Sequence, residues 1–91
     1  MEQNLIIIDD DIPFRDRLAR SMERKGFVVE AYGSTKKAKV RLKEKKFTYA
    51  IIDMRLKDGS GLEIIQFIKK INAEKRNNVD EFQERNYDSQ K

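Results

Sequence analysis

Acidic residues follow two apolar runs of the sequence, and they form its clearest chemical pattern. Asp9, Asp10 and Asp11 come directly after the apolar run Leu5–Ile8, and Asp53 ends another apolar run about 43 residues later. Carboxylates that lie close together repel one another unless a cation neutralises them. Mg²⁺ suits such a group, because it binds a few carboxylates together with retained waters and a phosphate oxygen.

Neither acidic element is specific when taken alone. Acidic residues are common at strand ends, where the chain returns to water, and Asp11 is explained as a helix N-cap without any metal. The pattern gains weight because two runs end in acids and the second is followed by a loop that contains Gly59 and Gly61. The sequence has no Cys and no His, so thiolate metal sites, imidazole bases and His-dependent nucleophiles are excluded.

Strand-like and helix-like segments alternate along residues 1–71. The expected strands are Leu5–Ile8, Phe27–Tyr32 and Phe47–Ile52. The expected helices begin after Asp11, near Ser34–Thr35 and at Leu62. The inward face of the first helix is formed by Phe14, Leu18 and Met22, and that of the second by Ala38 and Leu42. The inward face of the third helix is formed by Leu62, Ile65, Ile68 and Ile71. Such alternation predicts an α/β fold with a parallel sheet and right-handed crossovers.

The predicted sheet has the order 2-1-3, which makes the first and third strands neighbours. The carboxyl ends of parallel strands meet at one edge of the sheet, where ligands of such folds bind. Asp9, Asp10 and Asp53 would then lie together at this edge, and the sequence predicts a metal site there.

Basic residues concentrate between Lys36 and Lys46, in a chain whose net charge is +4. We interpret this segment as a solvated helix face, and the alternative is a surface that binds nucleic acid or an acidic partner. No aromatic residues interleave with its charges as they do on single-strand stacking surfaces. Direct nucleic-acid binding is therefore not expected. No apolar run approaches the length of a membrane span, so we expect a cytoplasmic protein without membrane contact.

The sequence resembles the receiver domains of two-component response regulators over about 70 residues. The matching segments are Leu5–Asp11, Tyr49–Leu56 and Asp58–Glu63, and the spacing between the acid pair and Asp53 also fits. The loop after Asp53 lacks the family's usual proline and resembles a redox- and photosynthesis-regulating subgroup. The resemblance implies a flavodoxin-like (βα)3 portion of the receiver fold over residues 1–71.

The resemblance also implies a role for each residue of the acidic group. Asp53 would accept phosphate from a histidine kinase or a small phosphodonor. Asp10 and Asp9 would bind Mg²⁺ together with Asp53 and the backbone carbonyl of Arg55. Such a module is at most a self-catalysed phosphoacceptor and not an enzyme with an external substrate.

Residues 72–91 depart from the family pattern, because they contain no strand-like run. The interpretation is a polar tail that is disordered or extends the third helix. The family's fourth-strand Thr or Ser and fifth-strand Lys are then missing, which predicts an impaired switch. The third strand would be an exposed edge, so the chain is expected to form a homodimer through strand pairing, helix packing or exchange of elements.

Two alternatives remain open at this point. One is a non-catalytic interaction protein that competes for a kinase or regulator through its first helix. The other is a truncated or engineered receiver fragment whose main property is self-association.

Overall fold

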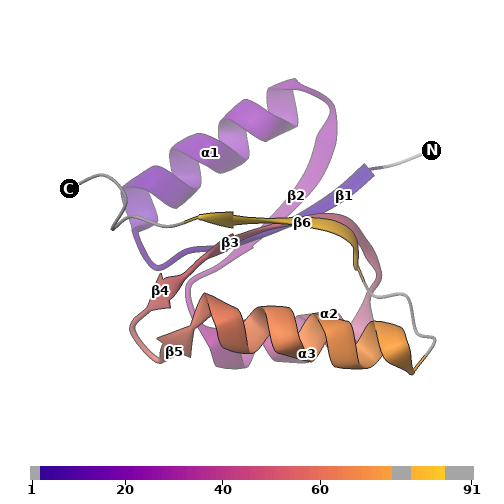
Figure 1. Cartoon of the computed structure of the whole chain (residues 1–91). Helices are drawn as coiled ribbons and strands as arrows, with labels where there is room; N and C mark the ends of the chain where they lie inside the picture. The colour runs from indigo at the N-terminus through magenta and orange to yellow at the C-terminus, as the bar shows by residue number, and fades with distance from the viewer. Residues whose placement is uncertain (1–2, 75–78, 86–91) are drawn as a thin grey trace.

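The computed structural model describes residues 3–74 and 79–85, which form a parallel sheet with helices on both faces (Figure 1). In chain order the elements are β1 (Gln3–Ile8), α1 (Ile12–Arg24), β2 (Phe27–Tyr32), α2 (Thr35–Glu44), β3 (Phe47–Asp53), β4 (Arg55–Leu56), β5 (Gly59–Ser60), α3 (Gly61–Ala73) and β6 (Val79–Arg85). None of the helices in these residues is both long and apolar enough to cross a membrane.

The main sheet has the order β2-β1-β3-β6, and every neighbouring pair is parallel. The predicted order 2-1-3 is confirmed for the first three strands. Each of the residues Leu5–Ile8 is at most 1% exposed to solvent. A continuous apolar run of this kind is what a strand covered on both faces requires.

The helices lie on opposite faces of the sheet, with α1 on one side and α2 and α3 on the other (Figure 1). Side chains with hydroxyl or carboxylate oxygens begin each helix. The caps are Asp11, which accepts from the amide of Phe14 at 3.1 Å, Ser34, which accepts from Lys37 at 3.1 Å, and Ser60, which accepts from Glu63 at 3.3 Å. Each cap satisfies an amide that has no partner inside its own helix.

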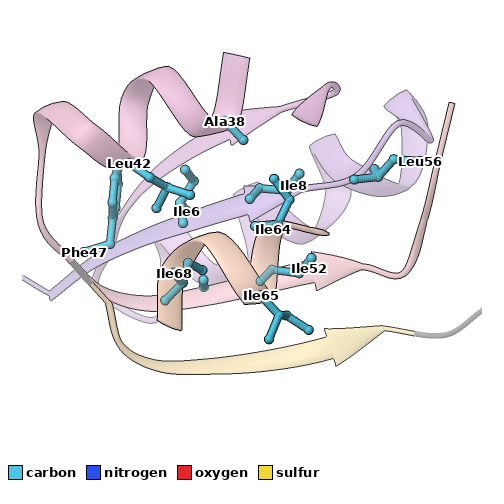
Figure 2. Close-up of a cluster of buried hydrophobic side chains, with 11 residues drawn as sticks. Ile6, Ile8, Ala38, Leu42, Phe47, Ile52, Leu56, Ile64, Ile65 and Ile68 are labelled. Atoms are coloured by element: carbon cyan, nitrogen blue, oxygen red, sulfur yellow. The ribbon is translucent and has the colours of Figure 1, made fainter. Parts of the chain in front are cut away.

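The main hydrophobic core fills the space between the sheet and the helices α2 and α3 (Figure 2). It is formed by Ile6, Ile8, Ala38, Leu42, Phe47, Ala50, Ile52, Leu56, Ile64, Ile65 and Ile68. The predicted inward positions Ala38, Leu42, Ile65, Ile68 and Ile71 are buried.

Leu62 was expected to face inward, and this prediction is wrong. Leu62 is 52% exposed, whereas Ile64 is completely buried. Helical residues advance by about 100° each, so a stripe that contains Ile64, Ile65 and Ile68 leaves Leu62 to one side of it.

The region after α3 differs most from the sequence-based expectation. No strand was expected there, yet Val79–Arg85 forms β6, which pairs with β3 and places Arg85 in register with Asp53. Asn72 and Ala73 continue α3, whereas Val79–Arg85 is a strand and not a helical extension. Because β6 covers it, β3 is not an exposed edge. Pairing with β6 satisfies the backbone hydrogen-bonding groups of β3. The absence of an apolar run in Val79–Arg85 had argued against a strand there, but backbone pairing does not require apolar side chains. The remaining tail residues, 75–78 and 86–91, lie outside the described residues.

Candidate functional site

The candidate site lies at the carboxyl ends of two neighbouring strands. Asp9 and Asp10 follow β1 directly, and Asp53 is the last residue of β3. Ile8 and Ile52 are in register, so the acidic residues that follow them emerge at the same level of the sheet edge. The structure thus brings together the three side chains that the sequence predicts.

These three carboxylates form a compact group of oxygen donors. One oxygen from each of Asp9, Asp10 and Asp53 lies within 4.8 Å of the others. Asp9 and Asp53 are 1% and 0% exposed, so little solvent separates the negative charges. An all-carboxylate set at this spacing fits a hard divalent cation such as Mg²⁺, which would offset the repulsion.

Backbone amides position each of the three carboxylates. The amide of Asp11 donates to Asp9 Oδ1 at 2.9 Å, and the amide of Arg55 donates to Asp53 Oδ1 at 3.1 Å. The amide of Lys57 donates to Asp10 Oδ2 at 2.8 Å, across 47 positions of the sequence. The first two contacts are local side-chain turns, and the third ties the β3–α3 loop to the end of β1.

Arg55 lies in β4 and its side chain is exposed. Its amide contacts Asp53, which places the residue next to the acidic group. The use of its backbone carbonyl as a metal ligand stays a prediction.

Gly61 lets the loop return closely onto Asp53. A Cβ atom at this position would overlap the carbonyl oxygen of Asp53 and lie 2.8 Å from Cα of Met54. The amide of Gly61 donates to the carbonyl of Met54 at 3.2 Å. Only glycine fits this approach without a backbone shift, and it brings the start of α3 against the end of β3.

Arg15 contacts the backbone of Asp9, which was not anticipated from the sequence. Its Nη1 donates to the carbonyl oxygen of Asp9 at 3.4 Å, and its side chain is partly buried. The Nε atom is buried without a hydrogen-bond partner among the described residues. The contact links α1 to the backbone at the end of β1.

Asp58 is a second residue whose role was not anticipated. Its carboxylate accepts from the amide of Thr35 at 2.9 and 3.1 Å and from the amide of Lys36 at 3.4 Å. These hydrogen bonds, above all the one from Thr35, lower the pKa of Asp58. The partner lies 23 positions away, so no local pattern signals the contact.

Comparison with protein families gives one match over most of the chain. The family described as response regulator receiver domain matches residues 5–79. The photosynthetic apparatus regulatory protein RegA of Cereibacter sphaeroides is 38% identical over 69 residues, which cover 76% of this chain and 38% of RegA. The acid tolerance regulatory protein ActR of Rhizobium meliloti is 44% identical over 68 residues, which cover 75% of this chain and 35% of ActR. The chain thus spans well under half the length of these relatives.

Solved structures show the same fold. A receiver domain protein from Methanospirillum hungatei has a TM-score of 0.76 at 17% identity, covering 93% of this chain and 82% of that chain. A response regulator from Burkholderia pseudomallei, solved with a phosphorylated aspartic acid, a calcium ion and citrate, has a TM-score of 0.70 at 22% identity. The match covers 92% of this chain and 60% of that one.

Proposed function

Because this chain belongs to the response regulator receiver domain family, matched over residues 5–79, we propose that the Asp53 carboxylate accepts a phosphoryl group. Receiver domains of two-component systems are not conventional enzymes, and the reaction here is a self-catalysed transfer. The observation that carries the proposal is the grouping of Asp9, Asp10 and Asp53 within 4.8 Å at the sheet edge. The proposed donor is a histidine kinase or a small phosphodonor, and the proposed location of the module is the cytoplasm.

Mg²⁺ is the cofactor that these residues fit. The side chains of Asp9, Asp10 and Asp53 and the backbone carbonyl of Arg55 would hold it. When bound, it supplies positive charge that stabilises the phosphoryl oxygens in the transition state.

The residues of the chain position the nucleophile. The amide of Arg55 donates to Oδ1 of Asp53 at 3.1 Å, which restrains the orientation of the carboxylate. A carboxylate oxygen of Asp53 attacks phosphorus in line with the bond to the donor. A new O–P bond forms while the bond to the donor breaks, and the donor leaves with the bonding electron pair. A carboxylate nucleophile has no proton to lose as it attacks, so this step needs no general base.

Phosphorylation of this chain would be a weak switch. The resemblance places a phosphate-sensing Thr or Ser at the end of the fourth family strand. In this chain Arg85 is the residue of β6 in register with Asp53. A hydroxyl residue does not occupy that register position, which supports the proposal of an impaired response to phosphorylation.

A mass measurement tests the proposal directly. Wild-type protein incubated with Mg²⁺ and acetyl phosphate should gain one phosphoryl group, whereas Asp53→Asn should gain none. Asp16→Asn is the matched control, because Asp16 is exposed on α1 and is not one of the three grouped carboxylates. An unmodified wild type, or equal modification of Asp53→Asn, would contradict the assignment. The unmodified result would favour a non-catalytic interaction protein instead.

The predicted homodimer also belongs to this proposal. Since β6 pairs with β3 inside the chain, a second copy would pair at β2 or β6, pack on a helix face, or exchange elements with the first copy. Sedimentation velocity should give the mass of two chains, and a compact monomer at micromolar concentration would contradict it.

A further inference from the structure

Most of the basic side chains on α2 already have partners. Lys39 forms an ion pair with Glu63, and Lys43 lies 5.9 Å from the ring centroid of Phe67. Arg41 Nε lies 2.7 Å from Glu30, and Nζ of Lys45, the residue just after α2, lies 3.0 Å from the same carboxylate. The local excess of positive charge is therefore reduced on the parts of α2 that face β2 and α3.

Lys36 and Lys37 differ from these residues. Both side chains are exposed, and neither forms an ion pair with any residue in the described part of the chain. Their uncompensated charge therefore lies together at the first turn of α2.

The two lysines line an open hollow of about 460 Å³ beside α2. Its walls are formed by Tyr32, Lys36, Lys37, Val40, Arg41 and Glu44. We name it the α2 groove. Val40 is 53% exposed, so an apolar side chain lies next to the two unpaired ammonium groups.

The helix terminus itself does not attract an anion here. Carboxylate oxygens of Asp58 already accept from the amides of Thr35 and Lys36, and Ser34 accepts from the amide of Lys37. Any affinity of the α2 groove for negative charge therefore comes from the lysine side chains.

We propose that the α2 groove binds an acidic, extended segment of a partner protein that carries one apolar side chain. The acidic groups pair with Lys36 and Lys37, and the apolar side chain packs on Val40 between Tyr32 and α2. Charge complementarity identifies this occupant, since the groove joins uncompensated cations to exposed apolar surface. This interaction goes beyond phosphate acceptance at Asp53 and does not depend on it.

The same lining favours a peptide over a nucleic acid. Glu44 is part of the groove wall, and it would repel a continuous row of phosphates. Arg41, the other cation of the wall, is already held by Glu30 through Nε and Nη2 at 2.7 and 3.0 Å. Tyr32 donates its hydroxyl to Glu30 at 2.8 Å, so its ring is fixed beside the groove.

Fluorescence anisotropy with a labelled peptide tests the proposal. The probe has several Asp and Glu residues around one Leu, with Gly at both ends. Reversing both lysine charges, in Lys36→Glu/Lys37→Glu, should weaken binding by about tenfold or more. The control Lys69→Glu/Lys70→Glu makes the same charge change at exposed positions of α3 and should stay within about threefold of wild type. Circular dichroism confirms that both double variants are folded.

Two further measurements separate the peptide from other occupants. Val40→Ser, or a probe with Ser in place of Leu, should weaken binding by about threefold to tenfold. An oligonucleotide of similar charge should bind more weakly than the peptide. Equal losses in the two lysine double variants, no effect of Val40→Ser, stronger oligonucleotide binding, or no peptide binding would each overturn the proposal. Asp53→Asn should bind the peptide normally, which distinguishes this test from that of phosphate acceptance.

Discussion

The carboxylate of Asp58 accepts hydrogen bonds from the backbone amide of Thr35 at 2.9 and 3.1 Å, and so the loop after β3 caps the start of α2. The hydroxyl of Thr35 returns a contact to the carbonyl oxygen of Asp58 at 3.4 Å. These hydrogen bonds in both directions join the β3–α3 loop, which carries part of the candidate site, to the start of α2.

Asp58→Ala should destabilise the fold, because it removes acceptors from the amides of Thr35 and Lys36. The thermal midpoint is expected to fall by a few degrees, as for the loss of one helix cap. Asp58→Asn keeps one acceptor oxygen and should lose less. Thermal unfolding by circular dichroism measures both variants, with Asp16→Ala as an exposed control. Equal midpoints for Asp58→Ala and wild type would show that Ser34 alone suffices as the cap.

Glu30 should make the stability of the protein depend on pH in the acidic range. Hydrogen bonds from Arg41, followed by those from Lys45 and Tyr32, lower the pKa of Glu30 from 4.5 to about 2. A depressed folded-state pKa contributes stability that is present above pH 4.5 and is lost as the pH falls towards 2. After allowance for solvent screening, the contribution is about 1 kcal/mol.

Urea unfolding between pH 5 and 2 measures this dependence. The decline in the free energy of unfolding should be shallower in Glu30→Gln than in wild type. Glu23→Gln, at an exposed position of α1, should follow the wild-type curve. Parallel curves for Glu30→Gln and wild type would contradict the role given to this carboxylate.

Gly61→Ala should damage both the fold and the acidic site. Its Cβ would overlap the backbone of Asp53 and Met54, so the loop must shift, at about 1–3 kcal/mol of stability. The matched control is Gly59→Ala, whose Cβ would meet side-chain atoms of Glu63 at 2.8 Å and Thr35 at 3.0 Å. Because the Glu63 side chain can move, the control should lose less stability. Urea unfolding and acetyl phosphate labelling compare the two, and equal losses in both would contradict the backbone argument.

Neutralising Asp53 should have opposite effects with and without Mg²⁺. Asp53→Asn removes one of three clustered charges, so without the ion it should raise the free energy of unfolding by about 1 kcal/mol. Wild type should gain stability as Mg²⁺ is added, because the ion binds the folded state, and the variant should gain much less. Thermal unfolding across an Mg²⁺ titration measures this, with Ca²⁺ as a second ion. Equal stabilisation of the variant and wild type would exclude Asp53 from the metal site.

The strand and helix order up to α3 and the acidic group were predictable from sequence, because local patterns encode them. The apolar run Leu5–Ile8 identifies a buried strand, and the alternation of elements fixes a parallel order. Asp9 and Asp53 then meet because they follow neighbouring strands. Each inference depends only on residue type and spacing.

The remaining features depend on contacts that residue type does not reveal. β6 pairs with β3 through the backbone, although its sequence is rich in charged residues. Asp58 finds its partner 23 positions away. Arg15 contacts the carbonyl of Asp9 only after β1 and α1 have formed and packed together. Leu62 was misplaced because it lies three positions from Ile65 and just outside the buried stripe.

Two consecutive residues of the β3–α3 loop join two distant parts of the molecule. The amide of Lys57 binds Asp10, and the carboxylate of Asp58 binds the first residues of α2. A movement of the loop that breaks one of these contacts therefore strains the other, because a single peptide unit joins Lys57 to Asp58. Coupling between two binding sites is reciprocal. If an ion at Asp10 changes the affinity of α2 for a partner through this peptide unit, the partner changes the affinity of the site for the ion by the same factor.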